Sequence, residues 1–188
     1  MRSSARARGY TLIELMLVVA LVGVLATLAI IGYRKWVRGA HVAEGQDMVA
    51  AIRAGEERYY SENGSYLSVT TGLGDGYTYP SIHPSSFATA WGVSCSTCVG
   101  SGYAGLGVSS NAPVFFGYST IADSTKTAQT LVGTKTTNGV VIDLSSMSTG
   151  QPWYFIEADA NISGDKTNYM HVYGMNATNT IFVDGEGN

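Results

Sequence analysis

An apolar run near the start of the chain limits what this protein can fold into. Every residue from Tyr10 to Ile31 is apolar or small, apart from two threonines and Glu14, and three arginines precede the run. At about 1.5 Å per residue, a helix over residues 11–31 matches a hydrocarbon core of about 30 Å. A cleavable secretory signal would have a shorter apolar stretch of roughly 7–15 residues, followed by a small-residue cleavage site. The run therefore predicts a membrane-embedded N-terminal helix.

Glu14 is the one acid in this apolar run. A carboxylate at the centre of a bilayer costs about 2.5–3.5 kcal/mol on insertion scales, so such residues usually have a function and a partner. One interpretation places Glu14 a turn inside the membrane, hydrated or protonated. The other starts from Gly9, the small residue between the basic leader and the apolar run. Cleavage after Gly9 would create an α-amino group on Tyr10, with an unperturbed pKa of about 7.7–8.0, as a partner for Glu14.

The segment RGYTLIELMLVVALVGVLATLAI resembles the N-terminal signature of type IV pilins and the related type II secretion pseudopilins. This resemblance implies a leader peptide over residues 1–9, cleavage after Gly9 by a prepilin peptidase, and N-methylation of Tyr10. It also implies that Glu14 meets the terminal amine of a neighbouring subunit during assembly. The implied partners are further copies of the chain in a helical filament, the membrane and an inner-membrane assembly platform. The precursor would reside in the inner membrane as a single-pass protein, and the assembled subunit in an extracellular pilus.

Two positions depart from the usual pattern of that family. Tyr10 stands where phenylalanine is usual, which exchanges one aromatic residue for another. Ile31 stands where many major pilins carry a proline, which would remove a backbone hydrogen bond and kink the helix. Its absence favours a minor or secretion-type subunit.

The remaining sequence predicts an α+β protein, and the resemblance implies that this is the pilin fold. The helix is expected over residues 10–63, and Met48, Ile52, Gly55 and Tyr59 form an apolar stripe on its second half. Turn residues dominate residues 64–112, which predicts a loop, and the resemblance implies that it is the variable loop of pilins. A roughly four-stranded antiparallel meander packed on the helix is expected over residues 113–188. The segments with strand character are PVFFGYSTI, AQTLVGTK and GVVIDL, the latter two around Asn138-Gly139, and then WYFIEADA, YMHVYGM and TIFVD.

The two cysteines, Cys95 and Cys98, form a CSTC motif. A CxxC motif occurs in redox sites, in zinc sites and as a tight disulfide. Zinc would need two more ligands, and the three histidines show no ligand spacing. A thioredoxin-like site would need a βαβ setting, which this loop lacks. Outside the cytoplasm, a disulfide between the two residues is favoured.

The segment DANISGDKTNY resembles the start of a calcium-binding loop. Asp159, Asn161 and Ser163 have the spacing of the first ligands, and Asp165 follows a glycine. The last ligand position is Met170, which cannot coordinate calcium. Runs of this kind also form ordinary turns between strands, so calcium is a weak candidate, and no other cofactor or metal is expected.

The charge distribution excludes some functions. After Arg58 the sequence has three lysines and nine acidic residues, so general nucleic-acid binding is not expected. No Ser/His/Asp, metal or phosphate-loop pattern predicts an enzyme. Three hypotheses remain: a structural subunit of a type IV pilus; a minor pilin or pseudopilin with a priming, adhesion or DNA-uptake role; and a membrane-anchored redox protein using Cys95 and Cys98.

Overall fold

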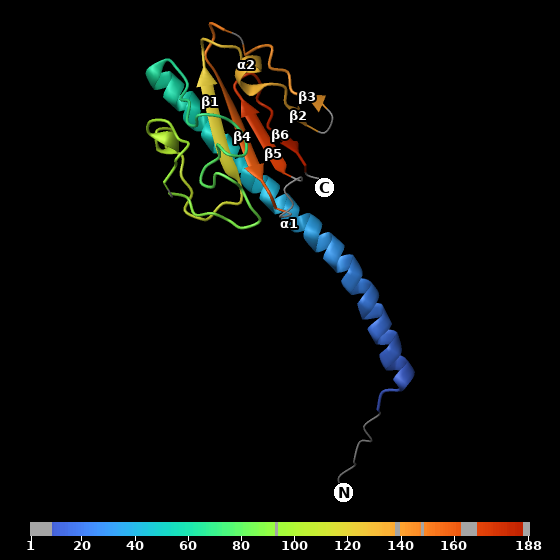
Figure 1. Cartoon of the computed structure of the whole chain (residues 1–188). Coiled ribbons are helices and arrows are strands. Elements are labelled where there is room, and N and C mark those ends of the chain that lie inside the picture. Colours follow the sequence, from blue (N-terminus) through green and yellow to red (C-terminus); the bar gives the residue numbers. More distant parts are fainter. Residues whose placement is uncertain (1–8, 93, 138–139, 148, 163–168, 186–188) are drawn as a thin grey trace. The chain divides into compact units, whose positions relative to one another are not determined.

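The computed structural model describes residues 9–92, 94–137, 140–147, 149–162 and 169–185 (Figure 1). The chain divides into two compact units, residues 1–38 and 39–188. A long helix, α1, spans Leu12–Asn63 and so contributes to both units. The other elements follow in the second unit: the short 3-10 helix η1 (Gly102–Ala104), β1 (Gly117–Asp123), α2 (Ala128–Val132), β2 (Thr136–Thr137), β3 (Val140–Val141), β4 (Trp153–Ala160), β5 (Met170–Met175) and β6 (Phe182–Asp184).

α1 contains no proline and passes through Ile31 without interruption. It ends at Asn63 because Gly64 takes a left-handed conformation, with φ of 72°. The amide N–H of Gly64 then donates to the carbonyl oxygen of Tyr60 at 2.8 Å, which satisfies one of the last free carbonyls of the helix.

Four antiparallel strands form the main sheet, in the order β1-β4-β5-β6. Figure 1 shows the second half of α1 lying along one face of this sheet. This arrangement confirms the predicted α+β fold. The four strands of the main sheet pair in chain order, as in a meander. One difference from the prediction is that β2 and β3, which lie between β1 and β4 in the sequence, form a separate two-stranded sheet.

The second half of α1 packs closely on the sheet through small residues. A Cβ atom on Gly45 would lie 2.9 Å from the ring of Phe116, and one on Gly174 would lie 2.7 Å from Val49. The predicted stripe is confirmed at Ile52 and Gly55, which are buried. Its other two members, Met48 and Tyr59, pack at the edge of the core.

Two acidic residues of α1 fix the surrounding loops, and the sequence pattern did not predict this. Glu44 accepts a hydrogen bond from the backbone N–H of Phe115 at 2.7 Å. Glu56 is fully buried and accepts one from the backbone N–H of Leu67 at 2.9 Å. Its second carboxylate oxygen has no partner among the described residues. Burial raises the pKa of Glu56 to about 8.

The segment AQTLVGTK was predicted as a strand, but its first five residues form α2. The preceding turn explains this difference, because the carboxylate of Asp123 accepts hydrogen bonds from the backbone N–H groups of Thr125 and Lys126. The chain thus turns directly into a helix, and Gly133 follows it with φ of 72°. The side chain of Ala128 faces a second apolar cluster on the sheet face opposite α1, formed with Ile121, Ile142, Leu144, Met147, Trp153, Phe155, Tyr173 and Met175. The dipeptide Asn138-Gly139 lies outside the described residues.

Candidate functional site

The start of α1 is a capping box. The side-chain oxygen Oγ1 of Thr11 accepts a hydrogen bond from the backbone N–H of Glu14 at 3.3 Å. The Oε2 atom of Glu14 in turn accepts the backbone N–H of Thr11 at 2.8 Å and its hydroxyl at 2.9 Å. Threonine and glutamate three positions apart satisfy the free donors of a helix start in this reciprocal way. Glu14 therefore has a local hydrogen-bonding role within the chain.

The residues before this turn are open to solvent. Tyr10 is 85% exposed, and a Cβ atom added at Gly9 would have no neighbour within 4 Å. Among the described residues, nothing therefore packs against the chain at Gly9 and Tyr10.

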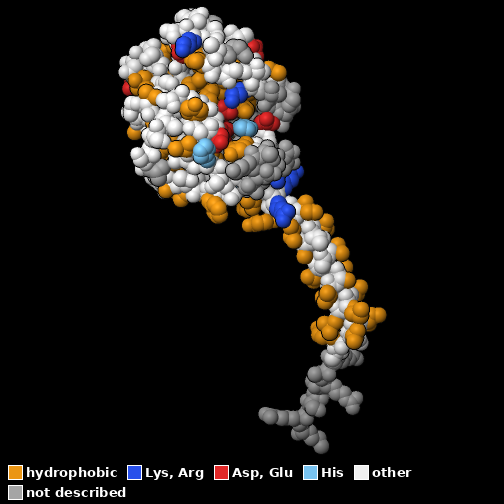
Figure 2. Space-filling model, in the orientation of Figure 1, with side chains coloured by type: hydrophobic (Ala, Val, Ile, Leu, Met, Phe, Trp, Pro, Cys, Tyr) orange, Lys and Arg blue, Asp and Glu red, His pale blue; other side chains and the backbone are white. Residues whose placement is uncertain are grey.

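The apolar side chains of the first half of α1 are exposed along its length (Figure 2). Among the described residues, α1 is the one helix that is long and apolar enough to cross a membrane. A soluble monomer rarely exposes so much apolar surface, so this segment requires a lipid or protein environment. The exposed large side chains include Leu12, Ile13, Leu17, Val19, Leu25, Leu28, Ile31, Tyr33 and Trp36.

Comparison with known proteins identifies this N-terminal region. Residues 4–30 match the family model described as the prokaryotic N-terminal methylation motif. Over its N-terminal helix, the chain is similar to type IV pilins.

Its relatives include the type IV major pilin protein PilA of Myxococcus xanthus, 34% identical over 39% of this chain and 33% of the relative. The fimbrial protein EcpC of Eikenella corrodens is 35% identical over 30% of this chain and 37% of the relative. A fimbrial protein of Neisseria meningitidis is 36% identical over 36% of this chain and 39% of the relative. The chain thus spans less than two fifths of the length of these relatives. No solved structure matches the chain significantly.

The predicted disulfide between Cys95 and Cys98 is confirmed. Neither sulfur is therefore a free thiolate of the kind that a zinc site requires. The bridge lies beside the loop that begins at Leu67, since the N–H of Val99 donates to the carbonyl of Val69 at 2.7 Å. The disulfide closes a small loop and holds it against the preceding segment.

Of the predicted calcium ligands, the structure describes Asp159 and Asn161, and Asp159 lies in a strand rather than in a loop. Asp159 belongs to β4, and its Oδ1 atom lies 2.6 Å from Nδ1 of His171 on β5. The neighbouring Glu157 accepts two hydrogen bonds from the ammonium group of Lys135, at 2.8 and 2.7 Å. Burial lowers the pKa of His171, but the hydrogen bond and charge of Asp159 outweigh this and raise it. Both carboxylates therefore already have a nitrogen partner, the ammonium of Lys135 for Glu157 and the imidazole of His171 for Asp159.

Figure 2 shows acidic, basic and histidine side chains gathered on one face of the second unit. Glu157, Asp159 and His171 bring potential ligand atoms within 4.8 Å of one another. Asn161 is buried, and its side-chain oxygen has no partner among the described residues. Ser163 and Asp165 lie outside the described residues, so calcium binding stays a prediction.

Proposed function

We propose that this chain is a structural subunit of a type IV pilus, made as a membrane-embedded precursor and assembled into an extracellular filament. The observation that carries the proposal is the start of α1. There, Glu14 forms a capping box with Thr11, and it is followed by a helical segment whose apolar side chains are exposed. The match of residues 4–30 to the methylation motif supports the same conclusion.

The proposed sequence of events uses three neighbouring residues. A prepilin peptidase cuts after Gly9 and methylates the new terminus at Tyr10. The apolar helix keeps the subunit in the inner membrane, where an assembly platform receives it. Glu14 then attracts the terminal amine of a neighbouring subunit, since a carboxylate in an apolar setting is stabilised by an opposite charge. The apolar helices bundle and bury their exposed surface against one another.

Within this plan, residues 1–9 are the leader and residues 10–63 form the helix, whose first half enters the filament core. Residues 64–112 form the variable loop, and residues 113–188 form the sheet of the head. Both of the latter segments face the filament exterior.

The test separates the charge of Glu14 from its capping role. Glu14→Gln keeps a side-chain oxygen for the capping box and removes the charge. We expect normal membrane insertion and at least a tenfold loss of surface filaments, which corresponds to about 1.4 kcal/mol per subunit contact. Thr11→Ala removes the cap and keeps the charge, so its filaments should decrease less. The matched control is Glu62→Gln, at an exposed acid near the end of the same helix.

Filaments that incorporate Glu14→Gln as efficiently as the natural chain would contradict the proposed charge pair. A second measurement addresses processing. Replacement of Gly9 by a bulky residue should leave the leader attached, which mass spectrometry detects as an excess over the mature chain.

A minor pilin or secretion pseudopilin is the second candidate, favoured by the uninterrupted passage of α1 through Ile31. The stoichiometry of the chain in purified filaments distinguishes the two. A major subunit forms most of the filament mass, whereas a minor subunit is present in few copies.

A further inference from the structure

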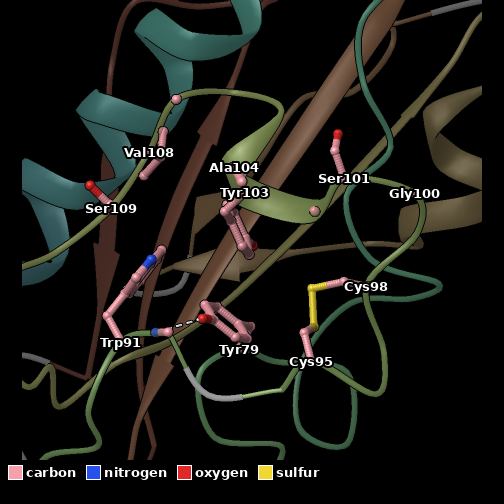
Figure 3. A pocket seen from close by; sticks show the side chains of 13 residues that line it. Tyr79, Trp91, Cys95, Cys98, Gly100, Ser101, Tyr103, Ala104, Val108 and Ser109 are labelled. Atoms are coloured by element: carbon pink, nitrogen blue, oxygen red, sulfur yellow. Dashed lines mark hydrogen bonds between the residues drawn. A yellow bond between two sulfur atoms is a disulfide. The ribbon is translucent and has the colours of Figure 1, made fainter.

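A pocket of about 650 Å³ opens in the segment between α1 and β1, beside the disulfide (Figure 3). Its volume lies within the range of about 300–1,000 Å³ that is typical of small-molecule sites in proteins. All of its lining residues belong to the second unit of the chain. Filament assembly through the first half of α1 makes no use of it.

One wall of the pocket is aromatic. Trp91 meets Tyr79 edge to face, with ring centroids 5.0 Å apart, and lies 5.6 Å from Tyr103. The two tyrosines are buried, whereas Trp91 is partly exposed. Figure 3 shows the Trp91 side chain at the border of the pocket, beside Tyr79. An aromatic ring held in this way offers a flat surface at little cost in conformational entropy.

Polar groups with unused hydrogen-bonding capacity are also among the lining residues. The hydroxyl oxygen of Tyr79 accepts the backbone N–H of Gly92 at 2.8 Å, which holds the turn after Trp91 in place. The indole N–H of Trp91 and the hydroxyls of Ser101 and Ser109 have no hydrogen-bond partner among the described residues. A fully apolar ligand would remove water from these groups without replacing its hydrogen bonds.

The lining contains no Asp, Glu, Lys or Arg in the described chain. The Arg58 guanidinium lies beside the lining residue Gly107. A charged ligand seated elsewhere in the pocket would lose hydration without gaining an ion pair, which disfavours its binding. The wall opposite Trp91 includes Cys95 and Cys98, whose disulfide restrains the loop. The adjacent segment is held by a hydrogen bond from the N–H of Thr71 to the carbonyl of Thr97 at 3.0 Å. A restrained pocket loses less entropy when a ligand binds.

We propose that this pocket binds a neutral saccharide unit. A pyranose ring has an apolar face of C–H groups and a rim of hydroxyls, which matches both parts of the lining. Its C–H groups carry partial positive charge and stack on the negative face of the Trp91 ring. Its hydroxyls exchange hydrogen bonds with the indole N–H and the two serines. The small residues at the rim, among them Gly100 and Ala104, leave the entrance open to a chain end or a branch of a larger glycan.

The test uses the full-length chain in a zwitterionic detergent, because detergents with sugar head groups would compete for the pocket. The probes are the methyl glycosides of glucose, galactose, mannose and N-acetylglucosamine, observed by saturation-transfer NMR up to about 20 mM, a range that includes weak millimolar binding. Glucuronate and glucosamine serve as charged counterparts. We expect saturable binding of at least one neutral glycoside and binding at least fivefold weaker for its charged counterpart.

Variants then locate the binding. Trp91→Ala should weaken it at least tenfold, whereas Trp91→Phe keeps a stacking face and should weaken it about two- to fivefold. Trp36→Phe is the matched control, because Trp36 lies on the exposed part of α1 and outside the pocket. Ala104→Phe fills the entrance from an exposed position, and it tests the site even if Trp91→Ala fails to fold. Near-UV circular dichroism checks that each variant is folded.

The absence of saturable binding for all four neutral glycosides would overturn the proposal. So would binding that survives Ala104→Phe in a folded variant, or equal binding of the charged and neutral probes. Because this readout is independent of filament formation, it separates a failure of this inference from a failure of the proposed pilus function.

Discussion

The two halves of α1 belong to one helix, but their side chains have different surroundings. In the first half, apolar side chains such as Leu25 and Ile31 are more than 60% exposed. In the second half, Val49 and Ile52 are fully buried, and Glu44 and Glu56 accept hydrogen bonds from the loops. The second half therefore depends on its own chain for stability. The first half depends on its surroundings, and this difference predicts which substitutions affect folding and which affect assembly.

Truncation of an apolar side chain should separate the halves most strongly. Ile52→Ala removes a fully buried side chain, and we expect a loss of about 2–5 kcal/mol in the free energy of unfolding because a cavity remains. Ile30→Ala, the matched variant in the exposed half, should leave the unfolding of the head within about 0.5 kcal/mol of the natural chain. Urea denaturation in detergent, followed by tryptophan fluorescence, measures both. Equal losses would show that the two halves are not different.

The buried carboxyl of Glu56 predicts an effect of pH that is specific to the second half. Its folded-state pKa of about 8 lies above the usual value of 4.5 for a glutamate side chain, so the folded protein retains a proton that the unfolded chain releases. The stabilisation is fully present below about pH 4.5 and is lost as the pH rises towards 8. The expected slope is about 1.4 kcal/mol per pH unit, or about 3 kcal/mol between pH 5 and 7.

Glu56→Gln should remove this contribution, because glutamine keeps an oxygen for the N–H of Leu67 without a titrating group. The natural chain should therefore lose unfolding free energy relative to Glu56→Gln as the pH rises from 5 to 8. Glu62→Gln, at an exposed position of the same helix, is the control and should not change the pH profile. A constant difference between pH 5 and 8 would mean that Glu56 is ionised in the folded protein.

A glycine pair provides a finer comparison. A Cβ atom on Gly55 would lie 2.7 Å from the backbone oxygen of Leu106, so Gly55→Ala should destabilise the head by about 1–3 kcal/mol. Gly23 has no neighbour within 4 Å, and Gly23→Ala should not destabilise the head, since alanine favours a helix. Filament yield is the complementary measurement. A Gly23→Ala chain with a normal head and fewer filaments would place a close helix contact in the assembly.

The parts of the fold that follow from local pattern were predictable from the sequence. The apolar run, the periodic stripe through Ile52 and Gly55 and the apolar, aromatic-rich segments of β4 and β5 each carry their own signal. α2 was not predicted correctly, because its helix depends on a turn at Asp123 and on burial of Ala128 against a distant part of the chain. Five residues are too few for periodicity to distinguish the two structures.

The candidate sites divide in the same way. The Thr-x-x-Glu spacing of Thr11 and Glu14 is the sequence signature of a capping box, whereas the prediction for Glu14 used only its charge. The pairing of Glu157 with Lys135 joins positions that are 22 residues apart, and no local pattern announces it. The pocket at Trp91 likewise requires the folded loop, because its walls come from separate turns of an irregular segment.

The outer side of β1 has a further consequence for the proposed assembly. Its backbone groups are already paired with the preceding loop: Tyr118 exchanges two hydrogen bonds with Tyr79, and the carbonyl of Thr120 accepts the N–H groups of Val69 and Thr70. At the opposite border, β6 is only three residues long. Open strand borders allow unrelated copies to join by β-pairing and to aggregate. In the proposed filament, neighbouring heads would therefore find little template for such pairing along the described borders of the sheet.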